Sequence, residues 1–163
     1  MKEVAIVLLA ALMLNGCGST TTVQTPTSAI WSAVLTGGSG DAPDPSFNTQ
    51  FTLNGDGSLN ITFIQFLTQQ PCFAVAGGTE SGQATLQINS SNYAVTGTLT
   101  YTVQSGNNTL SLNGLDVTGT ELGTTLTNAL VTGTWTATGD PGCVTSGTFT
   151  MTQCISGACT PIP

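Results

Sequence analysis

Basic side chains are nearly absent from this chain of 163 residues. Lys2 is the one lysine or arginine, and there is no histidine. Beyond Lys2 the chain therefore cannot assemble a Ser-His-Asp or Cys-His nucleophile, a lysine base, a histidine metal ligand or an arginine clamp for phosphate. Nucleic acid is a poor partner, because its binding needs cations that neutralise phosphates. We predict that the protein is not an enzyme and has no cofactor.

The charge that remains is acidic. Asp and Glu number 8, and the net charge is −7. Because these acids have no cations to pair with, we expect mutual repulsion to raise the pKa values of carboxyl groups in the folded state. A raised carboxyl pKa gives stability that is present at low pH, so the melting temperature should hold steady or rise from neutral pH toward about pH 4.

Apolar runs long enough to span a bilayer as a helix of about 20 residues are missing too. Residues 4–14 form a shorter apolar run, followed by Leu14-Asn15-Gly16-Cys17. This arrangement resembles the lipobox of bacterial lipoprotein signal peptides, in which the cysteine is acylated, as with palmitate, and becomes the new N-terminus. The resemblance implies that 1–16 is a signal peptide and that Cys17 is a lipid anchor. Gly18, in place of the Asp that favours inner-membrane retention, implies the outer membrane.

Residues 18–28 are mostly Thr, Ser and Gly and have almost nothing to bury. We interpret residues 17–28 as the lipidated cysteine and a flexible tether that reaches about 15–20 Å. The length of the remainder, 29–163, suits a single domain.

Apolar and threonine side chains alternate along residues 131–152. Val131, Trp135 and Phe149 fall on one face of the expected hairpin, and threonines fall on the other. This period of two is typical of β-strands. The pattern recurs, and it predicts strands near 29–36, 46–54, 57–66, 82–89, 92–104, 108–114, 128–138 and 145–153. In the third of these, Ile64 and Phe66 change parity, which indicates a bulge.

Short turns between these strands, such as Asn54-Gly55-Asp56-Gly57, predict a meander. We therefore predict an all-β domain, an antiparallel up-and-down β-barrel of about eight strands that is lipocalin-like in shape, with a two-sheet β-sandwich as the alternative. Residues 115–127 fit either a short extra hairpin or a loop. The threonine face must lie outside in water, which is the reverse of a transmembrane barrel.

Cys17 aside, four cysteines remain, and an even number in an exported chain indicates two disulfides. In an up-and-down barrel, alternate loops lie at opposite ends. Cys72 follows the third strand and Cys143 follows the seventh, so both lie at one end, whereas Cys154 and Cys159 follow the eighth strand at the other end. We predict the disulfides Cys72–Cys143 and Cys154–Cys159.

Two long expected loops, 37–45 and 67–81, share the Cys72 end of the barrel, which faces away from the tether. They and the 139–143 turn gather four acids beside Phe73: Asp41, Asp44, Glu80 and Asp140. Carboxylates bind Ca²⁺, and carboxylate pairs hydrolyse glycosides, but the spacing matches no EF-hand loop and nothing marks out a pair. We interpret the acids as solvated loop carboxylates with no metal site, and we expect any functional mouth to lie at this end.

Two functions fit these features. The first is a lipid-anchored protein of the cell envelope with a filled barrel and a structural or interaction role, partnered by the membrane and by another envelope protein. The alternative is a lipocalin-like binder that holds a small apolar ligand inside the barrel. A solid core favours the first, and a cavity open at the Cys72 end favours the second. The sequence leaves open whether the domain faces the periplasm or the cell surface.

Overall fold

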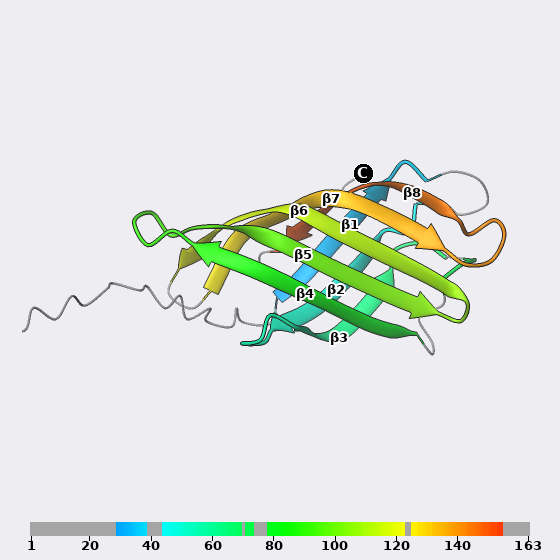
Figure 1. Cartoon of the computed structure of the whole chain (residues 1–163), viewed down its shortest axis with the longest axis horizontal. Coiled ribbons are helices and arrows are strands. Elements are labelled where there is room, and N and C mark those ends of the chain that lie inside the picture. Colours follow the sequence, from blue (N-terminus) through cyan, green and yellow to red (C-terminus); the bar gives the residue numbers. More distant parts are fainter. Residues whose placement is uncertain (1–28, 39–43, 70, 74–77, 123–124, 155–163) are drawn as a thin grey trace, which may run out of the picture.

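The computed structural model describes residues 29–38, 44–69, 71–73, 78–122 and 125–154. This part of the chain folds as eight strands without a helix (Figure 1). The strands are β1 (Ala29–Thr36), β2 (Phe47–Leu53), β3 (Leu59–Phe66), β4 (Thr79–Ile88), β5 (Ala94–Ser105), β6 (Asn108–Leu122), β7 (Thr125–Thr138) and β8 (Thr145–Gln153).

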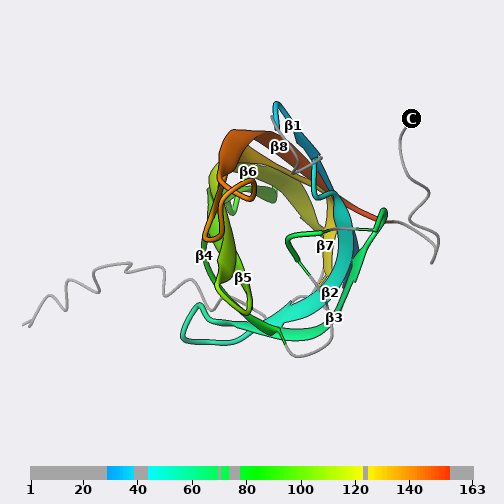
Figure 2. The same cartoon turned by 90° about the vertical axis from the view of Figure 1, so that its right-hand side faces the viewer.

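All eight strands belong to one antiparallel sheet in the order β3-β2-β1-β8-β7-β6-β5-β4. The first strand pairs with the last, from Trp31↔Gln153 to Thr36↔Thr148, and this pairing curls the sheet into a barrel (Figure 2). The predicted up-and-down barrel is therefore confirmed, and the two-sheet sandwich is not adopted. The barrel is nearly closed, and its one opening lies between β3 and β4, the two ends of the sheet.

The ambiguous segment 115–127 is neither a separate hairpin nor a loop where the structure describes it. Its residues extend β6 and β7, which pair from Thr109↔Thr138 to Leu122↔Thr125. Two register shifts interrupt this ladder, one between Gly114 and Asp116 and one between Thr118 and Thr120. Each shift changes which side chains point inward.

The barrel interior takes the apolar side chains, and the outer face takes the threonines. Trp135, Val131 and Met151 are each 0 % exposed. Thr134, Thr148 and other alternate residues of the same strands are exposed. The alternation in the sequence therefore sorts the side chains as predicted, with threonine on the outside.

The absence of a side chain at Gly147 leaves room for the Trp135 indole in the wall of the barrel. The two residues face each other across β7 and β8, and the Trp135 Nε1 donates a hydrogen bond to the Thr36 carbonyl oxygen at 3.1 Å. A Cβ at Gly147 would lie 2.7 Å from Nε1 and would collide with the Thr36 carbonyl oxygen. The absence of a side chain at this position therefore lets the largest core residue pack where β1 meets β8.

A series of aromatic rings in contact runs through the interior from Trp31 in β1 to Phe73. Ring centroids are 5.2 Å apart for Trp31 and Phe51, 6.3 Å for Phe51 and Tyr101, 5.4 Å for Tyr101 and Phe47, 5.8 Å for Phe47 and Phe66, and 6.0 Å for Phe66 and Phe73. Such contacts each add about 0.5–1.5 kcal/mol beyond the burial of area. The interior at this side of the barrel is a packed core.

The predicted turn between β2 and β3 is confirmed. Gly57 has a φ of 87°, and its N–H donates to the Asn54 carbonyl oxygen at 3.0 Å. The Asp56 carboxylate accepts hydrogen bonds from the Ser58 N–H at 2.9 Å and the Ser58 hydroxyl at 2.6 Å. This turn delivers the chain into β3, at the edge of the sheet.

Candidate functional site

The Cys72 end of the barrel is tied together as the sequence predicts. Cys72 and Cys143 form a disulfide with a Cα–Cα distance of 5.6 Å and a sequence separation of 71. It joins the β3–β4 connection to the β7–β8 turn, two loops that follow odd-numbered strands. The prediction from alternate loops is therefore confirmed for this pair.

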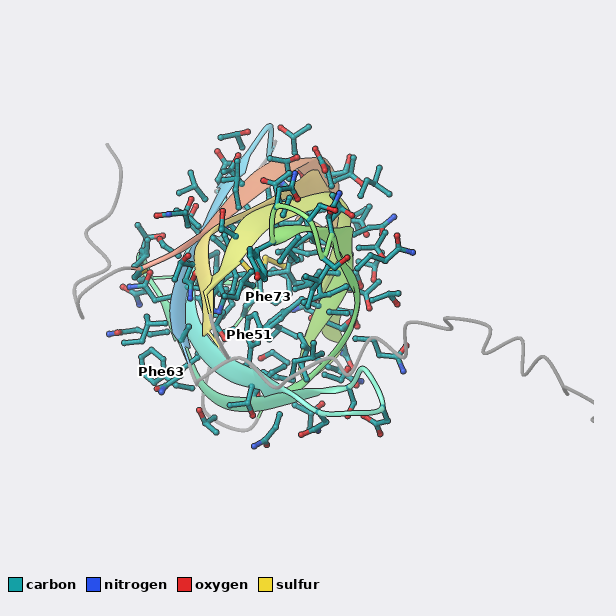
Figure 3. The ribbon with its side chains drawn as sticks, turned by 90° about the vertical axis from the view of Figure 1, so that its left-hand side faces the viewer. Phe51, Phe63 and Phe73 are labelled. Atoms are coloured by element: carbon teal, nitrogen blue, oxygen red, sulfur yellow. A yellow bond between two sulfur atoms is a disulfide. The ribbon has the colours of Figure 1, made fainter. Side chains whose placement is uncertain are left out.

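This end is closed by a short plug, residues 71–73. Phe73 is 2 % exposed and lies inside the barrel, where its ring stacks on Phe66 (Figure 3). The buried Asn108 side chain donates from Nδ2 to the Cys72 carbonyl oxygen at 2.9 Å, and its Oδ1 accepts from the Asp140 N–H at 2.8 Å. The expected mouth is thus occupied by the protein itself, held by one disulfide and one buried amide.

The acids expected at this end separate in the structure. Asp44 accepts a hydrogen bond from the Gly38 N–H at 2.7 Å, and Asp140 accepts one from Asn107 at 3.3 Å. Asp41 lies outside the described residues. Within the described part of the chain, no three Asp, Glu or Cys side chains come close enough to hold a metal ion.

The other cysteines fall at or beyond the limits of what is described. Cys154 is disulfide-bonded. Its predicted partner, Cys159, and the predicted lipidation site, Cys17, lie outside the described residues, so the pairing of Cys154 with Cys159 and the lipidation stay predictions.

The opening between β3 and β4, which we call the seam, is the candidate functional site, because the Cys72 end of the barrel is occupied by Phe73. One bridge, Ser58↔Gln83, joins the two strands near the start of β3, and there the Ala84 N–H donates to the Gly57 carbonyl oxygen at 2.8 Å. Beyond this bridge each strand pairs only with its other neighbour, β2 or β5. The seam is therefore anchored at one end and opens along its length.

Leu59 fills the anchored end of the seam. Its side chain packs on Gly82 of β4, where an added Cβ would lie 2.6 Å from the Leu59 Cδ1. The Leu59 side chain is 8 % exposed although it begins an edge strand. A glycine opposite a leucine thus closes the wall with side-chain packing where the ladder of hydrogen bonds stops.

Further along, the seam forms a groove that is open to solvent. Two adjoining hollows of about 330 Å³ and about 430 Å³ lie along it. Glu80 lines both of them. The first is otherwise lined by Ile61, Thr62, Phe63, Ile64 and Gly78, and the second by Ser58, Leu59, Ser81, Gly82, Gln83, Thr100 and Thr102.

A bulge in β3 presents Phe63 to this groove. Phe51 pairs with Ile61 and Gln50 pairs with Phe63, so Thr62 is an extra residue in β3. This bulge, predicted from the change of parity, turns Ile64 inward and Phe63 outward. Phe63 is 42 % exposed and points away from the barrel, in contrast to Phe51 and Phe73 inside it (Figure 3).

Glu80 brings a negative charge to the same groove. Glu80 lies two residues before Gly82 in β4, so it is on the face of the strand that Gly82 and Ala84 turn toward the barrel interior. It is nevertheless only partly buried, because β4 is an edge strand. Within the described part of the chain its carboxylate accepts no hydrogen bond, and the sequence from residue 3 onward has no cation to neutralise it. The groove therefore combines an uncompensated carboxylate with aliphatic and aromatic side chains.

The negative charge of Glu80 reaches Tyr101 in the core. Burial raises the pKa of the Tyr101 phenol well above its usual range, and the Glu80 charge adds to the rise. The Thr49 hydroxyl donates to the Phe63 carbonyl oxygen at 2.8 Å, so at 2.7 Å from Thr49 it is Tyr101 that donates. A chain of two hydrogen bonds thus links the core to the backbone of the seam.

The period of two through Leu59 and Ile61 predicts that Phe63 lies on the inner apolar face, which is wrong because the bulge at Thr62 turns Phe63 outward. Glu80 was expected among the solvated acids of the Cys72 end. Two signals were present. Glu80 continues the apolar parity of Gly82, Ala84 and Leu86, and Phe63 falls where the parity of β3 changes. An acid at an inward position and an aromatic residue at a bulge together indicate an edge strand.

Comparison with protein-family models, with curated proteins and with solved structures gives no match for this chain. Among the described residues there is no helix long and apolar enough to cross a membrane. The functional interpretation therefore depends on the geometry of the barrel and on the sequence.

Proposed function

We propose that this chain is a lipid-anchored protein of the bacterial cell envelope whose barrel is a filled scaffold for interaction with another envelope component. The role is non-enzymatic, and the seam is the contact surface. The observation that carries the proposal is that the barrel has its one opening in the wall, at β3–β4, while its expected mouth is occupied by Phe73.

The packed interior favours this role over that of a lipocalin-like carrier. A binder of small apolar ligands needs a cavity of about 300–1,000 Å³ that covers most of the ligand. In this barrel the rings from Trp31 to Phe73 contact one another in series, and the two hollows at the seam are open to solvent and do not enclose a ligand.

The threonine-rich outer face supports an environment of water next to a membrane. Barrels that span membranes place apolar side chains outward, toward lipid. Here exposed threonines such as Thr98, Thr134 and Thr150 cover the outer face. Anchorage would then come from the acyl chains on Cys17, held at the outer membrane by a tether of residues 18–28.

Mass spectrometry of the protein purified from membranes tests the lipid anchor and the absence of a bound ligand together. We expect a chain that begins at an acylated Cys17 and carries no stoichiometric small molecule. An unmodified N-terminus would contradict the anchor. An apolar compound that co-purifies at one molecule per chain would contradict the scaffold and support the lipocalin-like binder.

Photo-crosslinking in intact cells tests the interaction role. A photoreactive amino acid placed at Phe63 in the seam is expected to give one discrete adduct with an envelope component. The same amino acid at Thr148, an exposed residue on the outer face of β8, is the matched control and should give none. Equal labelling from both positions, or none from Phe63, would contradict the proposal.

A further inference from the structure

We infer that the seam groove binds a cationic side chain, an arginine guanidinium or a lysine ammonium, presented by the partner protein, with Glu80 as its counter-ion. The inference rests on the proposed interaction role and names the chemistry that the seam recognises. It follows from three properties of the groove: its charge, its apolar lining and its edge strands.

The charge of the groove has no partner within the protein. Among the described residues, Glu80 is the one charged side chain that lines either hollow. The sequence after residue 2 has no Lys, Arg or His, so no side chain in that part of the chain can pair with this carboxylate. A cation that pairs with Glu80 would therefore come from another molecule.

The lining of the groove suits an organic cation better than a metal ion. Ca²⁺ takes 6–8 oxygen ligands, and Mg²⁺ takes a near-octahedral set. Ile61, Phe63 and Ile64 instead offer apolar surface beside the single carboxylate. The aliphatic stem of Arg or Lys packs on such surface while the charged head pairs with an acid, and an aromatic ring adds to the attraction.

The edges of the seam disfavour simple addition of a β-strand. The bulge at Thr62 interrupts the regular spacing of N–H and C=O groups along β3. An inward-facing charge such as Glu80 is a device that protects an edge from pairing with another chain. Side-chain recognition is consistent with both features, whereas an inserted strand would bury Glu80 without a partner.

Titration of the mature chain with n-butylguanidinium, followed by NMR of the backbone amides, tests the inference. We expect saturable shifts confined to Phe63, Glu80 and their neighbours. The uncharged analogue n-butylurea has nearly the same shape and should give no saturable shift. Equal binding of the two compounds, or no binding of n-butylguanidinium, would overturn the inference.

Substitutions identify the counter-ion. Glu80→Gln keeps the shape and should weaken n-butylguanidinium binding at least about fivefold, and Phe63→Ala should weaken it about twofold. Asp116→Asn removes an exposed acid on β6 and should change nothing. Equal unfolding midpoints will show that the variants are folded. Unchanged binding in Glu80→Gln would overturn the assignment, as would tighter binding of Ca²⁺ than of n-butylguanidinium at the same resonances.

The crosslinking arm separates this inference from the proposed function. If Glu80→Gln abolishes the adduct from Phe63, both stand. If the adduct persists in Glu80→Gln, the interaction role stands and the cationic partner is wrong. If no adduct forms even with Glu80 intact, the interaction role fails, whatever n-butylguanidinium does.

Discussion

The β1–β8 and β3–β4 junctions of the barrel differ sharply. At the β1–β8 junction six residue pairs form a ladder, and Trp135 seals it with a hydrogen bond to Thr36. At the β3–β4 junction one bridge and the packing of Leu59 on Gly82 take the place of a ladder. The first and last strands, β1 and β8, are thus joined by a full ladder of hydrogen bonds. The wall stays open between β3 and β4, although these two strands follow each other in the sequence.

The difference shows that adjacency in sequence does not by itself pair strands. The β3–β4 connection is drawn into the barrel end by Phe73 and by the Cys72–Cys143 disulfide. A connection that fills the end of a barrel does not act as a tight turn that sets the register of its flanking strands. The open seam and the filled end are therefore two results of the same loop.

Removal of the disulfide should have the largest effect, and it should act on the open junction. The double variant Cys72→Ser/Cys143→Ser frees a loop of 71 residues, and we expect a loss of about 4 kcal/mol of unfolding free energy in urea. Hydrogen exchange should rise in β3 and β4 more than in β1 and β8. A loss below about 1 kcal/mol would mean that the plug holds without the disulfide.

Gly147→Ala should break the closed junction. The added Cβ would collide with the Thr36 carbonyl oxygen and with the Trp135 indole, and we expect a cost of about 3 kcal/mol. Gly55→Ala is the control, because nothing lies within 4 Å of a Cβ there, and it should change stability by less than about 0.5 kcal/mol. Similar midpoints for the two variants in urea would contradict the importance of this contact.

Two phenylalanines of β3, on either side of the sheet, should differ by about 2 kcal/mol. Phe66 packs on Phe47 and Phe73, so we expect Phe66→Ala to cost roughly 2 kcal/mol. Phe63 is 42 % exposed, and Phe63→Ala should stay within about 0.5 kcal/mol. Equal costs in urea unfolding would show that Phe63 is structural, which would weaken its assignment to a contact surface.

Tyr101 should govern unfolding at alkaline pH. Its pKa is raised in the folded state by burial, so the stability it contributes is present below the unfolded pKa of about 10 and is lost as pH rises above that value. No lysine or arginine after Lys2 adds to this loss. Tyr101→Phe should cost about 1 kcal/mol at pH 7, through the lost hydrogen bond to Thr49, and should flatten the decline between pH 10 and pH 11. Parallel declines in urea unfolding would contradict this role.

Asp56 should have the smallest effect, at the turn that leads to the seam. Hydrogen bonds from the Ser58 hydroxyl and N–H lower the pKa of this carboxyl below 3.8. A lowered pKa gives stability that is present above the unfolded value and is lost as pH falls through the folded one. The melting temperature of the native chain should therefore fall slightly more than that of Asp56→Asn between pH 5 and pH 3. Identical pH profiles would show that the turn does not depend on this charge.

The direction at Asp56 corrects one expectation from composition. Repulsion among acids predicts raised carboxyl pKa values. For Asp56 this is wrong, because two hydrogen bonds from Ser58 stabilise the ionised carboxylate and lower its pKa. For the protein as a whole, the steady or rising melting temperature toward pH 4 stays a prediction.

The alternation of apolar and polar residues predicts much of the fold, because one face of each strand must be buried and therefore apolar. The limits of β1 and β8 match the prediction, and the bulge in β3 appears where Ile64 and Phe66 change parity. The pattern fails in 115–127, because the shifts after Gly114 and Thr118 reverse which residues point inward. A segment with two bulges has no single period to detect.

The candidate site was less predictable than the fold. The Cys72–Cys143 disulfide follows from the order of loops alone, and the structure confirms it. The groove does not follow from the order of the loops, because Glu80 and Phe63 line the same hollow only where β3 and β4 fail to pair. Nothing local distinguishes an edge strand from an inner one until the partners of every strand are known.

The sequence by itself determined that the chain has no Lys, Arg or His after Lys2, that its strands alternate threonine with apolar residues, and that Cys72 and Cys143 share one end of a barrel. These properties follow from the composition, from the alternation of neighbouring residues and from the order of the loops along the chain. The tertiary structure alone decided that the barrel opens at β3–β4, that Phe73 fills one end, and that Glu80 lies in a groove where no described residue pairs with it. Packing of distant side chains chooses among the pairings that alternation permits, and so it decides where an edge is left.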